Sequence, residues 1–206
     1  LTFDDLYVSN WTQARKKMSE AGLVGTVYAI SNRIGTYMTL QQLRDLEKLG
    51  WEIAVHGENS LGGMTLAEAE ADVLREKSTL AAYGFRGVDH YAYPGGVYTP
   101  EIIEMLRKYF TTARTICYRS HETIRPADPM RLRAISPGNL TAASVVTDAI
   151  TAAKTYKAWQ IVTIHDVDPT AALGTQWSVS NFGTMIDHIV SQGIPCRTVS
   201  DVIGSL

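Results

Sequence analysis

The chain has 206 residues, 45% of them hydrophobic, which is enough for one sizeable core and favours a single domain over residues 1–206. Its 19 basic and 21 acidic residues leave a net charge of −2, which argues against a nucleic-acid partner or an acidic membrane surface. No run of about 18 apolar residues is present, so we expect no membrane span. Because the chain opens with Leu and enters a predicted strand at once, we expect it to be excised from a longer polypeptide.

Strand-like and helix-like segments alternate along the chain. The predicted strands are residues 1–5, 25–30, 51–56, 90–94, 111–118, 131–135 and 159–165. The predicted helices are residues 11–21, 39–50, 65–84, 100–109, 140–156 and 181–193. Residues 195–206 are predicted as a strand that runs into a last short helix. Thr65 with Glu68 is a capping-box pattern for the third helix. Gly50 suits the end of the second helix, and Pro100 the first turn of the fourth.

This alternation predicts an α/β fold with a parallel sheet and helices outside it. The sheet could be closed into a barrel or open and doubly wound. Polar groups end at least four different strands, and in a barrel the chemistry collects at the carboxyl ends of the strands. We therefore predict a barrel, with parallel strands inside and helices outside.

Ionisable groups follow the first and third predicted strands. Asp4 and Asp5 in TFDD are adjacent, so their side chains should point to different sides, one free to bind a cation and the other to act on a water. His56 ends the third strand, and Ser60 closes the polar run after it. Imidazole and carboxylate together suit zinc or a similar divalent ion. The structural alternatives are that the Asp-Asp pair begins a turn and that the histidine only supports the fold.

Two further strand ends carry candidate groups. Tyr93, Pro94 and Gly95 begin a rigid turn whose glycines allow backbone N–H groups to approach a ligand as oxyanion donors. An ordinary strand-to-helix turn is the alternative. His165 in IHDVD could act as a general acid near neutral pH, while its two aspartates could bind metal or cap a helix.

In chain order, TFDD, VHGENS, AYPGG and IVTIHD resemble the polysaccharide deacetylase family (carbohydrate esterase family 4, the NodB-like domain), over essentially the whole chain. The resemblance implies a distorted (β/α) barrel of seven or eight strands. It implies that Asp4 is the general base and that His165 protonates the departing amine or alcohol. Asp5 and His56 would bind a divalent metal, with Ser60 where the family has a second His. The implied ion is Zn²⁺, with Co²⁺ or Ni²⁺ as alternatives.

The resemblance also implies oxyanion and substrate contacts. The backbone N–H of Gly95 would stabilise the oxyanion, in a turn shared with Tyr93 and Pro94. Ile164 would line a small pocket for the acetyl methyl. Trp177, in a predicted loop, could stack on a sugar ring or pack against the helix that follows it.

Two positions depart from the family pattern. Ser60 is a poorer zinc ligand than imidazole, so we expect weaker metal binding. Ala92 stands where the family has an Arg that pairs with the catalytic Asp, so the pKa of Asp4 should be less depressed. Three arginines from the irregular segment at 119–137 could supply the charge instead: Arg119, Arg125 and Arg133.

The resemblance implies a metal-dependent hydrolase that removes acetyl groups from N- or O-acetylated polysaccharide, with that substrate as its partner and no nucleic acid. It also implies an extracellular, cell-surface or virion-associated location. The departures at Ser60 and Ala92 favour an alternative, a carbohydrate-binding homologue that has lost turnover. An unrelated hydrolase on a similar barrel is the third interpretation.

Overall fold

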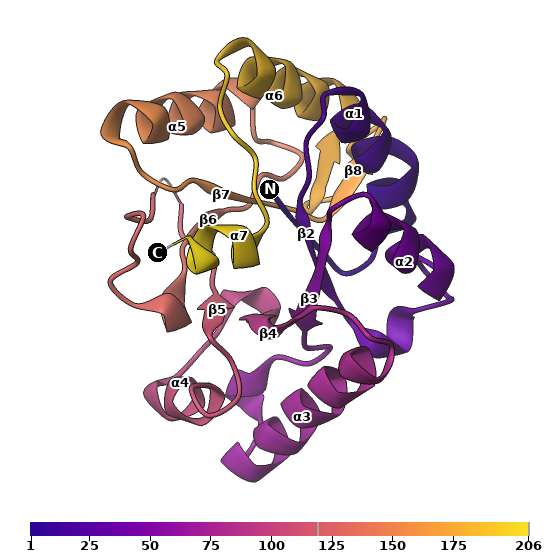
Figure 1. Cartoon of the computed structure of the whole chain (residues 1–206), viewed down its shortest axis with the longest axis vertical. Coiled ribbons are helices and arrows are strands. Elements are labelled where there is room, and N and C mark those ends of the chain that lie inside the picture. The colour runs from indigo at the N-terminus through magenta and orange to yellow at the C-terminus, as the bar shows by residue number, and fades with distance from the viewer. Residues whose placement is uncertain (119, 206) are drawn as a thin grey trace.

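The computed structural model describes residues 1–118 and 120–205. Seven parallel strands form its main sheet, in the order β5-β4-β3-β2-β1-β7-β6, with helices packed around them (Figure 1). Their bounds are β1 Thr2–Asp4, β2 Thr26–Ala29, β3 Glu52–His56, β4 Gly87–Ala92, β5 Thr112–Arg114, β6 Ala134–Ile135 and β7 Ile161–Ile164.

Backbone hydrogen bonds next to β6 join it to β5, so the sheet curls into a nearly closed ring. The Leu132 N–H donates to Ala113 O at 2.9 Å, and the Thr115 N–H donates to Leu132 O at 2.8 Å. Arg114 and Leu132 form a parallel bridge between the same segments. The predicted parallel barrel with helices outside is therefore confirmed, with seven strands.

The strands are buried on both faces, as expected when helices cover a parallel barrel. All residues of β1, β2, β3 and β7 are buried. Tyr28, Ala54 and Ala92 form a small cluster with Val199, separate from the main core. These strands therefore read as continuous apolar runs, with polar residues mainly at their ends.

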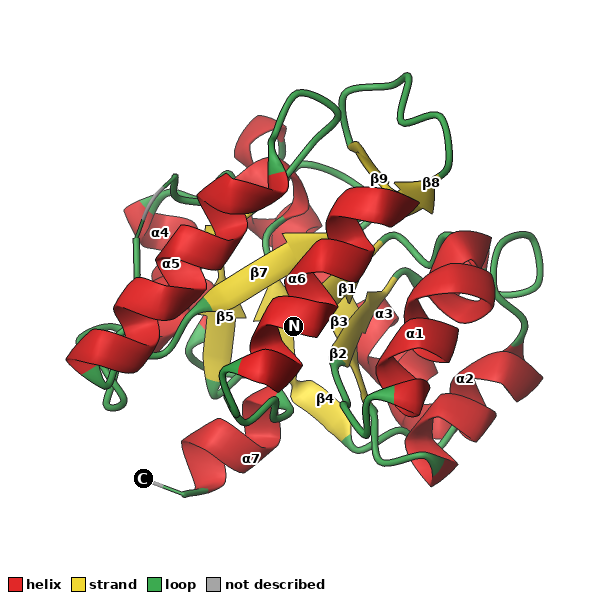
Figure 2. Ribbon diagram, turned by 90° about the horizontal axis from the view of Figure 1, so that it is seen from above, coloured by secondary structure: helices red, strands yellow, loops and turns green. Residues whose placement is uncertain are grey.

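Helices surround the strands in the view from above (Figure 2). Their bounds are α1 Arg15–Glu20, α2 Leu40–Lys48, α3 Leu66–Ala82, α4 Pro100–Leu106, α5 Ala143–Tyr156, α6 Val179–Ser191 and α7 Val199–Gly204, with a π-helical turn Asn10–Ala14 leading into α1. Across residues 1–118 and 120–205, no helix combines the length and apolar character needed to cross a membrane.

The predicted helix-boundary signals are confirmed. The Glu68 N–H donates to Thr65 Oγ1 at 3.3 Å in a complete capping box. Pro100 is the first residue of α4. Gly50, with φ of 87°, follows the end of α2 in the left-handed region that glycine adopts most easily.

The strand predicted at the start of residues 195–206 is wrong: residues 194–198 are irregular and lead into α7. The ring already closes between β5 and β6, so no edge is left for another strand. Instead, α7 covers the amino ends of the strands. The Glu52 carboxylate accepts from Val199 N–H at 3.0 Å, Ser200 N–H at 3.3 Å and Thr26 Oγ1 at 2.8 Å.

A small two-stranded parallel sheet, β8 Asp166–Asp168 with β9 Gln176–Ser178, was not predicted. Asp166 accepts from Ser9 Oγ at 2.6 Å, and Asp168 closes a turn by accepting from the Thr170 N–H at 2.8 Å. The predicted helix capping by these aspartates is therefore wrong, since Ser178 caps the helix that follows β9.

Candidate active site

The barrel brings four ionisable side chains to the carboxyl ends of its strands. Asp4 ends β1, His56 ends β3 and Arg114 ends β5, which are alternate strands of the ring. His165 follows directly after β7, whose Ile164 is paired in register with β1. Alternate strands direct side chains into the same layer of a barrel, so these groups meet although they are distant in sequence.

Three nitrogen groups converge on one oxygen of Asp4. Arg114 Nη2 lies 2.5 Å from Asp4 Oδ2, while His165 Nε2 and His56 Nε2 lie 3.9 and 4.0 Å from it. The Asp4 and Arg114 side chains are only 3% and 1% exposed, so water screens their ion pair little. The predicted grouping of Asp4, His56 and His165 is therefore present.

Arg114 corrects the expectation about the charge on Asp4. Burial by itself would raise the pKa of Asp4, but the Arg114 guanidinium, helped by His56 and His165, lowers that pKa below its ordinary value. Arg114 therefore supplies the positive charge beside Asp4 that Ala92 does not.

Arg114, on β5, supplies a guanidinium to Asp4. Of the three candidates in the irregular segment, Arg133 pairs with Glu122 at 2.7 Å, Arg119 lies outside the described residues, and a role for Arg125 stays a prediction. A charged side chain inside the apolar run TTARTICY was the signal that could have identified Arg114.

A left-handed turn after β1 places the Asp4 and Asp5 carboxylates on the same side. Asp5 has φ of 68° and Leu6 φ of 62°, which breaks the alternation of side chains along the strand. Asp5 Oδ1 lies 3.8 Å from His56 Nε2, the atom that also faces Asp4. The expectation that the two aspartates point to different sides is therefore wrong. Positive φ at non-glycine residues costs free energy and is concentrated at functional sites.

His56 is held in a defined tautomer. Its Nδ1 lies 2.8 Å from the backbone oxygen of Ala92, which can only accept, so Nδ1 carries the proton and Nε2 presents a lone pair to the two aspartates. Burial lowers the pKa of His56, against the opposing effect of Asp4 and Asp5, and so favours the neutral ring. A ring oriented through a carbonyl is typical of a metal-ligating histidine.

Two residues fit a divalent cation. His56 Nε2 and Asp5 Oδ1 face each other, and Asp4 Oδ1 is buried without a hydrogen-bond partner among the described residues. Within the same residues, no group of three or more His, Cys, Asp or Glu side chains is arranged to hold a metal. Ser60 is exposed, and its role as a ligand stays a prediction.

Arg33 is a site residue that the sequence did not reveal. It ends the 3₁₀ turn Ser31–Arg33 after β2, and its Nη1 lies 3.1 Å from Asp5 Oδ1. The sequence signal for Arg33 was the polar run SNR directly after a predicted strand, because the other candidate residues also lie at the ends of predicted strands.

The turn after β4 leaves its first glycine exposed. Gly95, with φ of 63°, is exposed within the 3₁₀ turn Pro94–Gly96. Tyr93 and Pro94 are buried, and the Tyr93 hydroxyl donates to Met130 O at 3.0 Å, so their side chains support the turn from inside. Ile164 is also fully buried. The roles of Gly95 and Ile164 toward an acetyl group stay predictions.

Trp177 packs inside the protein. It is 0% exposed, and its indole N–H donates to Thr141 O at 2.8 Å. Because stacking on a sugar needs an exposed ring face, the predicted substrate contact is wrong, and the alternative of packing applies.

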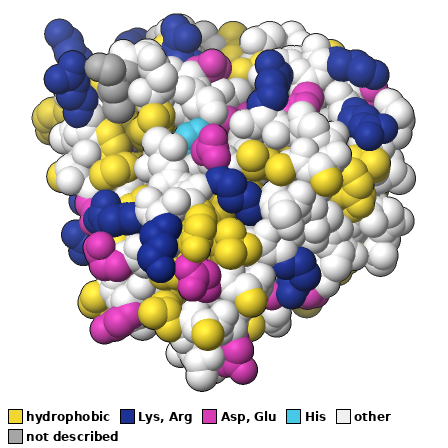
Figure 3. Space-filling view, turned by 60° about the horizontal axis from the view of Figure 1, so that its bottom comes forward, with side chains coloured by type: hydrophobic (Ala, Val, Ile, Leu, Met, Phe, Trp, Pro, Cys, Tyr) yellow, Lys and Arg dark blue, Asp and Glu magenta, His cyan; other side chains and the backbone are white. Residues whose placement is uncertain are grey.

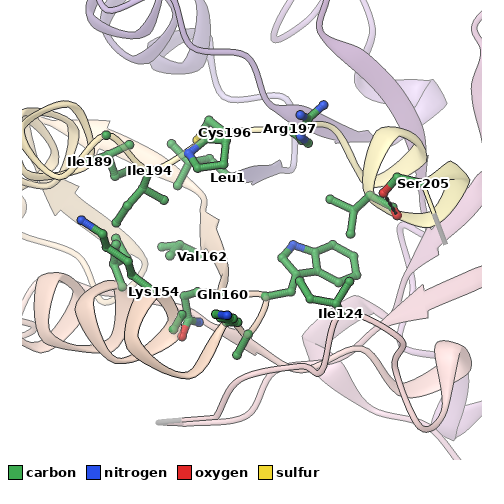
Figure 4. Close-up of a pocket in the computed structure, with 18 residues that line it drawn as sticks. Leu1, Ile124, Lys154, Gln160, Val162, Ile189, Ile194, Cys196, Arg197 and Ser205 are labelled. Carbon is green, nitrogen blue, oxygen red and sulfur yellow. Dashed lines mark hydrogen bonds between the residues drawn. The ribbon is translucent and has the colours of Figure 1, made fainter.

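A cavity of about 520 Å³ lies elsewhere, between α5, α6 and α7, beside Leu1 and Val162 (Figure 4). It is at the amino ends of the strands, where a barrel serves stability rather than catalysis. The face that carries α3 and α4 mixes basic, acidic and apolar side chains without a broad field of one sign (Figure 3). Neither feature competes with the site at the carboxyl ends.

Solved structures with the same architecture are carbohydrate esterases. The Xyl-CE4 domain of a multidomain xylanase from the hindgut metagenome of Trinervitermes trinervoides has 16% identity and a TM-score of 0.72, covering 99% of this chain and 88% of that one. A peptidoglycan deacetylase from Bacillus subtilis has 15% identity and a TM-score of 0.65, covering 98% and 88%. A family 4 carbohydrate esterase from Streptomyces lividans, in complex with acetate, has 14% identity and a TM-score of 0.63, covering 95% and 88%. At these identities the likeness shows a shared fold, the (β/α) barrel of these esterases.

The sequence identifies the family within that class. The family model described as polysaccharide deacetylase matches residues 1–113, more than half of the 206-residue chain. The chain therefore belongs to the polysaccharide deacetylase family, and the resemblance inferred from its motifs is confirmed. A search among curated proteins found no match.

Proposed function

We propose that this chain hydrolyses acetyl groups from an acetylated polysaccharide. The observation that carries the proposal is the convergence of Asp4, His56 and His165 within 4.0 Å at the carboxyl end of a deacetylase-family barrel. Such a cluster offers both a proton acceptor and a proton donor for hydrolysis.

Asp4 and His165 divide the proton transfers. Asp4, kept ionised by Arg114, accepts a proton from the attacking water. His165 then gives a proton to the amine or alcohol as its bond to the acetyl carbon breaks, and acetate is the other product. The exposed backbone at Gly95 would donate to the developing oxyanion.

Asp5 and His56 would hold a divalent cation, Zn²⁺ by ligand type, with Co²⁺ or Ni²⁺ as alternatives. When bound, the cation supplies Lewis-acid polarisation of the acetyl carbonyl. The neutral tautomer of His56 supports this assignment.

Acetate release tests the proposal. Acetylated xylan, N-acetylglucosamine oligomers and acetylated peptidoglycan are each incubated with the protein, with added Zn²⁺ or Co²⁺ or with chelator. We expect metal-stimulated release from one class and none from an Asp4→Asn variant. No release under any of these conditions contradicts the proposal. Glycan binding without release would instead support the carbohydrate-binding alternative, which serine at position 60, in place of a second histidine, favours.

A further inference from the structure

Each carboxylate of the site already has its own guanidinium. Asp4 pairs with Arg114 at 2.5 Å and Asp5 with Arg33 at 3.1 Å. These two ion pairs balance in charge without any bound ion. A divalent cation between Asp5 and His56 would therefore add positive charge beside a guanidinium that is already present.

The Arg33 guanidinium and a bound divalent cation would both contact Asp5 Oδ1. Arg33 Nη1 is 3.1 Å from Asp5 Oδ1, and His56 Nε2 is 3.8 Å from this same oxygen. Asp5 Oδ1 is thus both the acceptor for Arg33 and the oxygen that faces the histidine lone pair.

Hydrogen bonds to α3 and to the loop after β3 hold the turn that carries Arg33. The Ser31 N–H donates to Glu76 Oε2 at 2.7 Å, and Glu76, on α3, is only 1% exposed. The Asn32 side chain donates to Glu58, in the loop that follows β3. Two consecutive residues before Arg33 are therefore fixed to two different elements.

The Arg33 side chain is also held. Its guanidinium carbon lies 5.4 Å from the centre of the Tyr37 ring, and Tyr37 packs edge-on against Tyr7. The Arg33 and Asp5 side chains are 27% and 21% exposed, so the pair is partly shielded from water. Stacking on an aromatic face and a fixed backbone reduce the entropy lost when an arginine holds one geometry.

We propose that Arg33 is an internal counter-ion for Asp5 and competes with a divalent cation for Asp5 Oδ1. This rests on the proposed role of Asp5 and His56 as metal-holding residues. Metal binding then requires Arg33 to leave Asp5, which weakens the affinity of this chain for the ion. This cause of weaker metal binding is the presence of Arg33. It is separate from the absence of an imidazole at position 60.

Calorimetric titration of the whole chain with ZnCl₂ and CoCl₂, supported by the visible absorption of Co²⁺, tests the proposal. A single charge a few ångströms from a divalent ion predicts an affinity gain on the order of tenfold for Arg33→Gln. Arg33→Lys keeps the charge and should bind more weakly than Arg33→Gln. Arg86→Gln removes a remote cation, paired with Glu47 at 3.8 Å, and should match the wild type.

Equal metal affinity in wild type and Arg33→Gln, including no binding by either, overturns the inference, as does Arg33→Lys binding as tightly as Arg33→Gln. A gain that survives an added Asp5→Asn substitution also overturns it, because the ion would then lie elsewhere. Acetate release is recorded separately. Acetate release without a gain in metal affinity for Arg33→Gln refutes only the competition between Arg33 and the ion. A gain in metal affinity without acetate release refutes only the proposed deacetylase activity.

Discussion

The Arg114 guanidinium donates to Asp4 Oδ2 at 2.5 Å from inside the barrel, where neither side chain is more than 3% exposed. Arg114 also lies 5.0 Å from the centre of the Tyr28 ring. The ion pair lowers the pKa of a carboxyl whose pKa burial alone would raise. The site depends on this pair because an uncharged Asp4 could not accept a proton from water.

Replacing Arg114 by Met should destabilise the fold by about 3–5 kcal/mol at pH 7, since a buried charge loses its partner. In the variant, burial raises the pKa of Asp4 above its unfolded value, so folding takes up a proton and stability falls as the pH rises. The loss relative to wild type should therefore shrink between pH 7 and pH 4, as measured by urea unfolding.

The control for this prediction is Arg107→Met, whose side chain is 41% exposed and pairs with Glu104 and Asp128 at 3.1 Å. It should cost at most about 1 kcal/mol. An equal loss for Arg114→Met at both pH values contradicts the assigned direction of the Asp4 pKa.

Asp4→Asn should abolish acetate release while leaving the metal content largely intact, because Asp5 and His56 are the residues assigned to the ion. Asp5→Asn is the matched control and should lose metal. Acetate release and metal content are measured on the same samples. If Asp4→Asn loses metal as completely as Asp5→Asn does, the division of labour between the two carboxylates is wrong.

His165→Gln should slow release of an unactivated alcohol or amine by roughly 10²–10⁴-fold, as expected when a general acid is lost. A leaving group that needs no proton should be far less affected. Comparison of kcat for an acetylated sugar and for 4-nitrophenyl acetate measures the difference. An equal loss with both substrates would assign His165 to another step.

Ser60→His should raise metal affinity, because imidazole is a better zinc ligand than a neutral hydroxyl. We expect at least about tenfold by calorimetry, since second-sphere changes alone are worth 10–100-fold. Ser180→His on α6, a position not assigned to the ion, is the control and should change nothing. No gain in Ser60→His means that position 60 does not face the ion.

Glu52→Gln tests the opposite end of the barrel. The Glu52 carboxylate accepts from two backbone N–H groups at the start of α7, so its neutralisation should cost about 1–3 kcal/mol of stability. Acetate release at low temperature should be unchanged, because the reacting groups lie at the carboxyl ends. Glu20→Gln, an exposed position on α1, is the control for stability. A loss of activity without a loss of stability contradicts this purely structural role.

Much of the fold could be predicted because its signals are local. Strands buried on both faces read as apolar runs, and Thr65, Gly50 and Pro100 mark helix ends through bonds made within a few residues. The C-terminal strand was predicted wrongly because apolar character does not report whether a free sheet edge exists. Trp177 was ambiguous for the same reason, since a sequence does not state which face of a ring is covered.

Local sequence patterns specify the order of the apolar segments, and they locate the acids and imidazoles at the ends of these segments. The reason is that periodicity and helix caps depend on neighbouring residues. Which cations face those acids depends instead on tertiary packing. Arg114 and Asp4 are 110 positions apart, and their contact exists because the ring brings alternate strands into one layer. The left-handed turn at Asp5, which directs both carboxylates toward His56, likewise follows from packing around the strand end rather than from the residue types.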